Sequence, residues 1–216
     1  MKPSKMFLIL FFASALLAAY QAMFPVTASI AFTRFLGLEG FMLVCMSMMI
    51  GPLMVLRPLE YAPLVEPRRA VGLASFFIIA LHIFLATALE YEYNLAGELN
   101  QFPIFVAVPA ALIFLALALT SSDVAIHKLG VANWKTLQRF VYLAFILSFS
   151  HFLQMSTGLL TTTPSGLRFV NLSEVAMVLL GFATIGLQIA GFMAKRKRVS
   201  APSTNPVIPA QNSPQK

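Results

Sequence analysis

Long apolar runs alternate with short polar connections along most of the chain. Six of these runs are close to the roughly 20 residues that an α-helix needs to cross a hydrocarbon layer of about 30 Å. Runs of that length with almost no charge indicate membrane spans rather than helices of a soluble core. The six predicted helices cover residues 6–24, 37–56, 70–89, 102–120, 140–160 and 175–194.

Proline and basic residues mark several ends of these runs. Arg57-Pro58 ends the second run, Pro67-Arg68-Arg69 precedes the third, and Lys195-Arg196-Lys197-Arg198 ends the sixth. Residues 199–216 are rich in Pro, Ser, Asn and Gln, a composition that favours disorder. The sequence therefore predicts an all-α, polytopic membrane helix bundle over residues 1–198, followed by a disordered tail.

The composition supports the bilayer as the solvent of this protein. The chain has 216 residues, of which 59% are hydrophobic and 11% are charged, whereas a soluble domain has about 25% charged residues. The net charge of +7 does not predict a nucleic-acid partner, because the basic residues lie between apolar blocks and form no basic face. Cys45 is the single cysteine, which excludes a disulfide or a cysteine-based metal site within the chain.

The distribution of Lys and Arg predicts the orientation in the membrane. Twelve of these residues lie at the helix ends and connections that share a side with the N-terminus, and only Arg34 and Arg168 lie at the opposite ends. Because cytoplasmic connections carry the excess of positive charge, both termini are predicted to be cytoplasmic (N-in/C-in). We expect a multi-pass protein of the inner (plasma) membrane.

The first run has a second interpretation. Lys2 and Lys5, an apolar core and the small residues Ala18-Ala19 also resemble a secretory signal peptide. Cleavage would leave five helices and an external N-terminus. The apolar run continues to Phe24 without a clean small-x-small site, which favours a retained helix.

Two of the three histidines lie inside predicted helices. His127 falls in the polar connection 120–139, whereas His82 and His151 lie in the third and fifth helices. An ionisable side chain in hydrocarbon is costly and suggests a functional site. His82 follows Arg69 by 13 residues, and His151 follows Arg139 by 12. Both helices run outward, so the rings rise about 20 Å and 18 Å from the inner side and lie at one level in the outer half of the membrane.

Two imidazoles from different helices at one level match the needs of a bis-histidine haem, whose iron takes one ring on each face. Phenylalanine and aliphatic residues surround both histidines in the sequence, as an apolar haem slot requires. The alternative is that each histidine is hydrogen-bonded to a neighbouring helix without any cofactor. The pattern of residues by itself leaves both interpretations open.

Two blocks of residues resemble a known family. The first runs from Gly51-Pro52-Leu53 to Leu81-His82 and contains Arg68-Arg69-Ala70, and the second runs from Leu117-Ala118-Leu119 to His151 and contains Asn133-Trp134-Lys135. Their order and spacing over about residues 35–160 resemble ferric-reductase-like transmembrane domains. Within that family the similarity is greatest to the haem-binding membrane subunits of periplasmic methionine sulfoxide reductase systems.

The resemblance implies a membrane subunit that binds b-type haem and passes electrons across or within the membrane. His82 and His151 match the outer haem ligands of the family. Arg69, Trp134 and Arg139 are weaker cofactor-binding candidates, because basic and aromatic residues at these positions also serve as anchors at the membrane surface.

One departure from the family pattern concerns a second haem. Gln138 stands where the family usually has a histidine, 13 residues before His151, and Arg68 stands at the partner position on the third helix. Neither side chain replaces imidazole on haem iron, so we expect one haem, in the outer half. Electrons would then come from a membrane quinone or a partner reductase.

The sequence contains no Gly-rich dinucleotide fingerprint after a strand, and its connections are short. We therefore expect no catalytic residues, but a non-catalytic redox subunit of an oxidoreductase system with separate electron-donor and electron-acceptor proteins. The alternative is a cofactor-free membrane scaffold, an assembly factor or a small transporter on the same bundle.

Overall fold

The computed structural model describes residues 2–23, 27–91, 95–156, 160–162 and 168–200. Six helical segments are long and apolar enough to cross a membrane, which confirms the predicted all-α polytopic bundle. Five of the spans contain α1 (Pro3–Gln21), α2 (Ala28–Leu56), α4 (Val65–Leu89), α6 (Phe102–Leu119) and α10 (Leu172–Ser200), and the remaining span consists of α8 (Val131–Gln138) and α9 (Val141–Met155).

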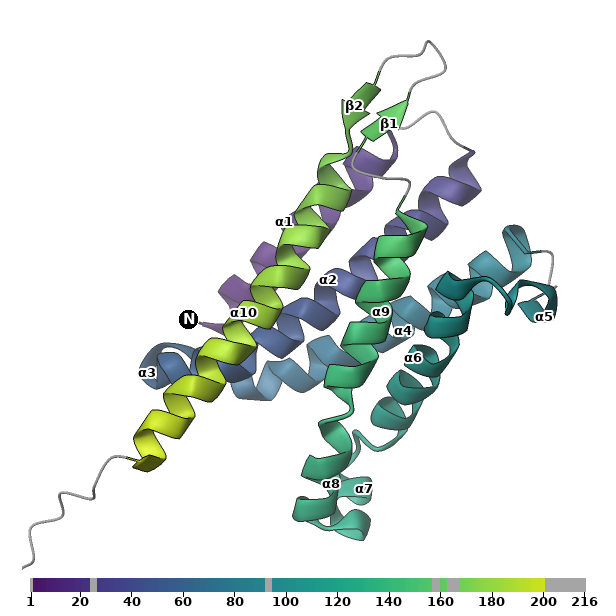
Figure 1. Ribbon diagram of the computed structural model, residues 1–216. Coiled ribbons are helices and arrows are strands. Elements are labelled where there is room, and N and C mark those ends of the chain that lie inside the picture. Colours follow the sequence, from purple (N-terminus) through teal and green to yellow (C-terminus); the bar gives the residue numbers. More distant parts are fainter. Residues whose placement is uncertain (1, 24–26, 92–94, 157–159, 163–167, 201–216) are drawn as a thin grey trace, which may run out of the picture.

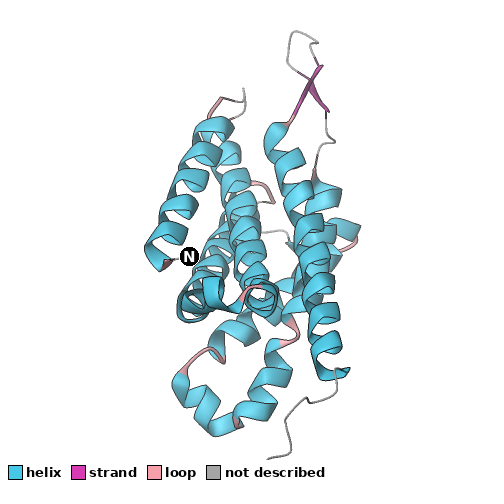
Figure 2. Ribbon diagram, turned by 90° about the vertical axis from the view of Figure 1, so that its left-hand side faces the viewer, coloured by secondary structure: helices cyan, strands magenta, loops and turns pink. Residues whose placement is uncertain are grey.

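The connections contain further short elements. The α2–α4 connection holds α3 (Pro58–Tyr61) and a 3₁₀ turn (Ala62–Leu64), and α5 (Leu95–Glu98) precedes α6. Between α9 and α10, strand β1 (Leu160–Thr162) pairs antiparallel with β2 (Arg168–Val170). This hairpin projects from one end of the bundle (Figure 2) and leaves the all-α class unchanged.

Several helix boundaries differ from the predicted ones, and α4 for example begins at Val65 rather than at residue 70. Helix α2 begins at Ala28, so most of the predicted outer connection 25–36 is helical. The lone charge of Arg34 interrupts the apolar run but does not break a helix, because arginine is a good helix former. At the other end of the chain, α10 continues past residue 194 through the basic residues to Ser200. The fifth long helix ends at Met155 rather than at residue 160. The predicted tail lies outside the described residues from 201 onward.

The predicted polar connection 120–139 is also helical, over α7 (Asp123–Leu129) and α8. Ser122 caps α7, because its hydroxyl accepts a bond from the backbone N–H of Ala125 at 3.1 Å. Gly130 separates the two helices with a φ of 74°, a left-handed conformation that glycine adopts without strain. His127, placed by the sequence in this polar connection, lies on the last turn of α7 and is exposed.

Helix α2 is the centre of the bundle. It contacts α1, α4, α9 and α10, and in Figure 1 it lies behind α9 and α10. Within the protein, 61% of its most apolar stretch is buried, against 11% to 28% for the other five spans. Most side chains on the outer helices therefore face the surroundings, as membrane helices do towards lipid.

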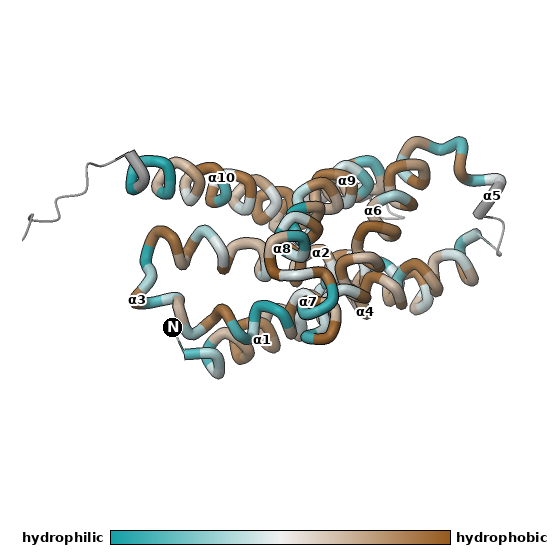
Figure 3. Tube along the Cα trace, turned by 90° about the horizontal axis from the view of Figure 1, so that it is seen from below, coloured by the Kyte–Doolittle hydropathy of each residue, from teal (hydrophilic) through white to brown (hydrophobic). Residues whose placement is uncertain are grey.

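The two ends of the bundle differ in their elements. The N-terminal end of α1, the short helices α3, α7 and α8 and the last turns of α10 lie at one end, and α5 and the β-hairpin lie at the other (Figure 1). Hydrophilic residues gather around α7 and α8 and at the end of α10 (Figure 3). This arrangement follows from six spans that alternate in direction, so the first turns of α1 and the last turns of α10 lie at the same end of the bundle.

Close approach of α10 to α2 requires a glycine. A Cβ on Gly191 would lie 2.6 Å from Cβ and 2.9 Å from Cα of Pro52, whereas a Cβ on Gly186 would meet nothing within 4 Å. Proline cannot move without displacing the α2 backbone, so an added methyl group at 191 must push the helices apart.

We therefore expect Gly191→Ala to lower the stability of the bundle by about 1–3 kcal/mol, the usual cost of overpacking. Gly186→Ala is the matched control on the same helix and should be neutral, or stabilising by up to about 1 kcal/mol through helix propensity. Thermal unfolding of both variants in detergent measures the difference. Equal unfolding temperatures for the two variants would contradict the tight contact.

Candidate functional site

A cavity of about 290 Å³ lies between α2, α4, α6 and α9, near the lower end of the ~300–1,000 Å³ range of small-molecule sites. Side chains from the C-terminal end of α1 and the N-terminal end of α10 complete its rim. Both intramembrane histidines, His82 and His151, line it. The structure thus brings together, in one cavity, the two side chains that the sequence singled out.

His82 is fixed by the backbone of α2. Its Nδ1 lies 2.9 Å from the carbonyl oxygen of Thr33. Because a carbonyl only accepts, Nδ1 carries the proton, and Nε2 keeps its lone pair. The ring also lies directly against Gly37, where a Cβ would be 3.0 Å from His82 Cε1. Glycine at 37 therefore leaves the space in which the imidazole sits.

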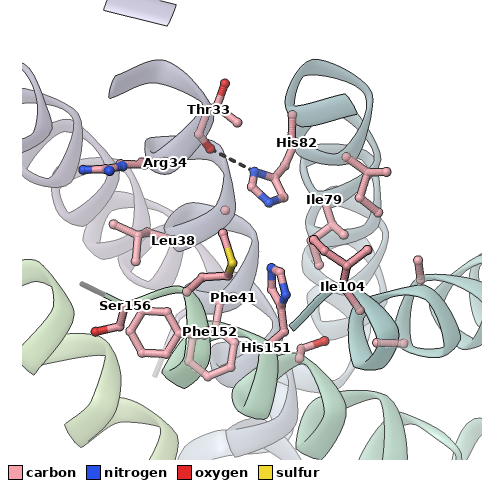
Figure 4. Close-up of a pocket in the computed structure, with 18 of the residues that line it drawn as sticks. Thr33, Arg34, Leu38, Phe41, Ile79, His82, Ile104, His151, Phe152 and Ser156 are labelled. Atoms are coloured by element: carbon pink, nitrogen blue, oxygen red, sulfur yellow. Dashed lines mark hydrogen bonds between the residues drawn. The ribbon is translucent and has the colours of Figure 1, made fainter. Parts of the chain in front are cut away.

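His151 has the same arrangement on the other side of the cavity. Its Nδ1 lies 2.9 Å from the carbonyl oxygen of Pro103, in the first turn of α6. The same reasoning places the proton on Nδ1 and the lone pair on Nε2. Figure 4 shows the rings of His82 and His151 pointing toward one another across the pocket. A backbone bond that fixes tautomer and orientation is the usual support of a metal-binding imidazole.

An aromatic wall closes the cavity on one side. Phe41 and Phe152 line it, with ring centroids 5.6 Å apart and an interplanar angle of 18°. Behind them, Phe145 and Phe149 stack on Phe41 at 5.7 and 5.6 Å. These rings are held by one another and by the core, so the wall is a rigid apolar surface suited to a flat, apolar ligand.

Polar residues gather at the end of the cavity that the C-terminal end of α1 and the N-terminal end of α10 close. Ser156 donates to Oε2 of Glu174 at 2.8 Å, and buried Gln21 donates to Ser173 at 2.9 Å. Arg34 also lines this end (Figure 4) and makes no hydrogen bond or ion pair with any residue that the structure describes. Burial raises the pKa of Glu90, and the positive charge of Arg34 opposes that rise. This end of the cavity can therefore receive an anionic group next to Arg34.

The three weaker candidates do not line this cavity. The guanidinium of Arg69 forms an ion pair with Asp123 at 2.7 Å, and Trp134 Nε1 donates to the carbonyl oxygen of Thr120 at 3.0 Å. Arg139 is exposed at the junction of α8 and α9. The contacts of Arg69 and Trp134 join α7 and α8 to the ends of α4 and α6, as expected of anchors at the membrane surface.

The two positions that replace family histidines also have structural contacts. Gln138 Nε2 donates to Leu117 O at 3.5 Å, a long bond. Arg68 Nε donates to Ser47 O at 3.0 Å, and Ser47 Oγ donates back to Arg68 O at 3.3 Å. Both side chains thus connect neighbouring helices, and neither belongs to the cavity that holds the histidines.

Sequence reasoning missed Gly37 and Arg34 as members of the site, because it placed residues 25–36 in a connection and gave Gly37 no role. Once α2 is extended to Ala28, Thr33 and Gly37 lie one turn apart and face the same side. Arg34, a lone arginine within an otherwise apolar stretch, was the feature of the sequence that could have indicated a role in the site.

Comparison with known proteins shows which family the chain resembles. The family model of the ferric reductase like transmembrane component matches residues 35–149, which include His82 and end two residues before His151. The chain is 31% identical over 125 residues to the protein-methionine-sulfoxide reductase heme-binding subunit MsrQ of Agrobacterium fabrum, covering 56% of either protein. It is 34% identical over 141 residues to the subunit of that name from Cronobacter sakazakii, covering 63% of this chain and 69% of the relative.

A third similar protein is the magnetosome protein MamZ of Magnetospirillum gryphiswaldense, at 32% identity over 124 residues. The match covers 56% of this chain but only 19% of that protein. The chain therefore spans little more than half of the Agrobacterium relative and a fifth of the magnetosome protein. No solved structure matches the chain.

The electrostatic effect of Arg34 on Glu90 can be tested without a ligand. Replacing Arg34 with Gln removes the positive charge that opposes the effect of burial, so the pKa of Glu90 should rise further above its ordinary value. Infrared titration of the protein with isotopically labelled glutamate measures this change. Arg69→Gln, at the opposite end of α4, is the matched control and should leave the pKa of Glu90 in place. A Glu90 titration that is the same in both variants would contradict the contact.

Proposed function

The chain belongs to the family of ferric reductase like transmembrane components, and on that basis we propose that it is a b-type haem-binding electron-transfer subunit of the membrane. The observation that carries the proposal is the pair His82 and His151. Each ring has its Nδ1 fixed by a backbone carbonyl and its Nε2 directed into one cavity. The names of two similar proteins, which describe them as heme-binding subunits, point to the same cofactor.

The residues of the cavity fit a haem in three respects. The two neutral imidazoles of His82 and His151 would hold the haem iron through their Nε2 atoms. Ile79, Phe41 and Phe152 supply apolar walls for the macrocycle edge. Arg34, at the polar end, supplies a cation for a carboxylate side chain of the macrocycle. Bound haem supplies a site that accepts and releases one electron at a time.

The protein's own contribution is to hold this site rigid and dry. Thr33 and Pro103 keep both imidazoles in the neutral, metal-binding tautomer. The stacked phenylalanines exclude water from one side, and Gly37 lets α4 lie close enough to α2 for His82 to reach the cavity. Rigid ligands reduce the reorganisation that accompanies each change of charge.

We place one haem in the outer half of the inner membrane, with both termini in the cytoplasm. The orientation rests on the excess of Lys and Arg at the N-terminal side. The single haem rests on Gln138 and Arg68, whose side chains are poor iron ligands and take part in helix contacts. Electrons then reach the haem from a quinone or a partner reductase.

The acceptor belongs at the outer face, where the cavity rim lies. Because two similar proteins are named as subunits of a protein-methionine-sulfoxide reductase, we propose a separate catalytic subunit as the electron acceptor. The chain itself then has no catalytic residue and serves as the redox relay of an oxidoreductase system.

Purified protein expressed with ample haem should show the Soret band of low-spin b-type haem, at about one haem per chain. His82→Ala and His151→Ala should each remove most of this signal, because loss of one axial imidazole leaves the iron without one of its two protein ligands. Oxidised and dithionite-reduced optical spectra, with a pyridine haemochrome assay for the haem content, measure both effects.

His127→Ala is the matched control, because His127 is exposed on α7, outside the cavity. It should retain the full wild-type signal. A wild-type protein without a Soret band would support the cofactor-free scaffold instead. A signal that survives in both cavity variants would disprove the ligand assignment, and two haems per chain would disprove the single site.

The donor can be tested on the same preparation. A short-chain ubiquinol analogue, added without oxygen, should reduce the haem in detergent or in proteoliposomes, because the proposed donor is a quinol dissolved in the bilayer. Stopped-flow absorbance of the reduced haem band measures the rate. Haem that dithionite reduces but quinol leaves oxidised would exclude this donor and favour a partner reductase.

A further inference from the structure

Glu39 has a buried carboxyl group that takes no part in the histidine cavity. Glu39 lies on α2, two residues from Gly37, and is 5% exposed. Its Oε2 is buried and has no hydrogen-bond partner among the described residues. Acidic side chains inside membrane spans are costly and rarely kept without a role. Neither the haem ligands nor the polar rim of the cavity uses this group.

The contacts of Glu39 fit a neutral carboxylic acid. Ser14 Oγ on α1 lies 2.7 Å from Glu39 Oε1 and 2.8 Å from the carbonyl oxygen of Leu10. A hydroxyl has one proton to donate, so Ser14 cannot donate to both oxygens at once. With a proton on Glu39, the carboxyl O–H donates to Ser14 Oγ, and Ser14 donates to Leu10. Only the protonated acid makes both contacts hydrogen bonds.

No positive charge compensates an ionised Glu39 in the described part of the chain, where the two ion pairs join other residues. Ser14 is the hydrogen-bond partner that α1 offers. The other ionisable groups on α2 and on the helices packed against it lie elsewhere along those helices. They are Lys2, Lys5 and Tyr20 on α1, Arg34 and Cys45 on α2, Glu60 and Tyr61 on α3, Glu66, Arg68, Arg69 and His82 on α4, Tyr142 and His151 on α9, and Glu174 and Lys195–Arg198 on α10.

Glu39 shares a turn of α2 with residues that line the cavity, although its own side chain points to Ser14 of α1 and does not line it. Its neighbours Leu38 and Phe41 line the cavity, and Gly37 touches the ring of His82. A charge at the cavity would act on Glu39 across the width of α2, on the order of 10 Å, through the protein interior, where screening is weak. An oxidised bis-imidazole haem carries one more positive charge than the reduced form, and that charge favours the carboxylate over the acid.

We infer that Glu39 is a redox-linked proton-binding site, which takes up a proton when the neighbouring haem is reduced and releases it on oxidation. This inference rests on the proposed function. On reduction, one electron from the donor converts ferric to ferrous iron. One proton from solvent then converts the Glu39 carboxylate to the acid. The net charge within the bundle then stays constant, and no bond to carbon or oxygen other than the carboxyl O–H changes.

Potentiometric titration of the haem-loaded protein at a series of pH values tests the inference. The midpoint potential of the wild type should fall as pH rises, by up to 59 mV per pH unit, because a tenfold change in proton concentration shifts a one-electron couple by that amount. Glu39→Gln should remove this slope. Its amide donates to Ser14 as the acid does, so the helix contact survives.

Glu66→Gln is the matched control, because Glu66 is an exposed carboxylate in the first turn of α4. It should keep the wild-type slope. Redox-difference infrared spectra of the wild type provide a measurement that needs no variant. Reduction should produce the C=O band of a protonated carboxylic acid, and the band should be absent from Glu39→Gln.

The outcomes separate the two proposals. Wild-type protein that binds no haem overturns both the proposed function and this inference. Haem that binds with a midpoint potential independent of pH overturns the inference alone. A slope that persists in Glu39→Gln, as titrating haem carboxylates would produce, also overturns it.

Discussion

Two hydrogen bonds from imidazole to backbone are the interactions on which the rest of the site depends. A carbonyl oxygen has two lone pairs, so a helical carbonyl can satisfy its own helix and still accept from a side chain. Thr33 and Pro103 use this second lone pair to hold His82 and His151. In hydrocarbon no water competes for these bonds. The same contact that satisfies a buried polar ring also fixes which nitrogen faces the cavity.

The central position of α2 follows from the same constraint. Without water, each buried polar group needs a hydrogen-bond partner in the protein, and the helices must pack closely. Small residues let other helices approach it: Gly37 receives His82 from α4, and Gly191 of α10 lies against Pro52. Small residues at such crossings are typical of membrane bundles, whose helices are not driven together by a hydrophobic effect. Helix α2 thus carries a carbonyl that holds His82, a glycine that makes room for its ring, and Phe41 for the aromatic wall. The site is built mainly on the helix that is packed most tightly.

The sequence predicted the six spans and brought His82 and His151 to one level, because apolar length and helical rise are local properties. It could not identify Thr33 or Pro103 as partners, since any residue can offer a backbone carbonyl. It also began α2 too late, at residue 37 instead of Ala28, and so missed Arg34 and gave Gly37 no role. Arg69, Trp134 and Arg139 lie outside the cavity, because basic and aromatic residues near a helix end serve the membrane surface as readily as a ligand. Distinguishing these roles requires the contacts between helices.

Glu39 illustrates why a buried acid in such a bundle is informative. A soluble protein can hydrate a carboxylate with small movements, but a helix in the centre of a membrane bundle has no such option. The acid must then be neutral, paired with a cation, or close to a charge that changes. Ser14 accommodates the neutral form, and no described cation pairs with the ionised one. The cavity beside Leu38 and Phe41 is where a positive charge would appear and disappear with each electron. Glu39 has both hydrogen bonds with Ser14 only when it is protonated. A change of charge at the cavity on the other side of α2 would therefore change its affinity for a proton through electrostatics alone.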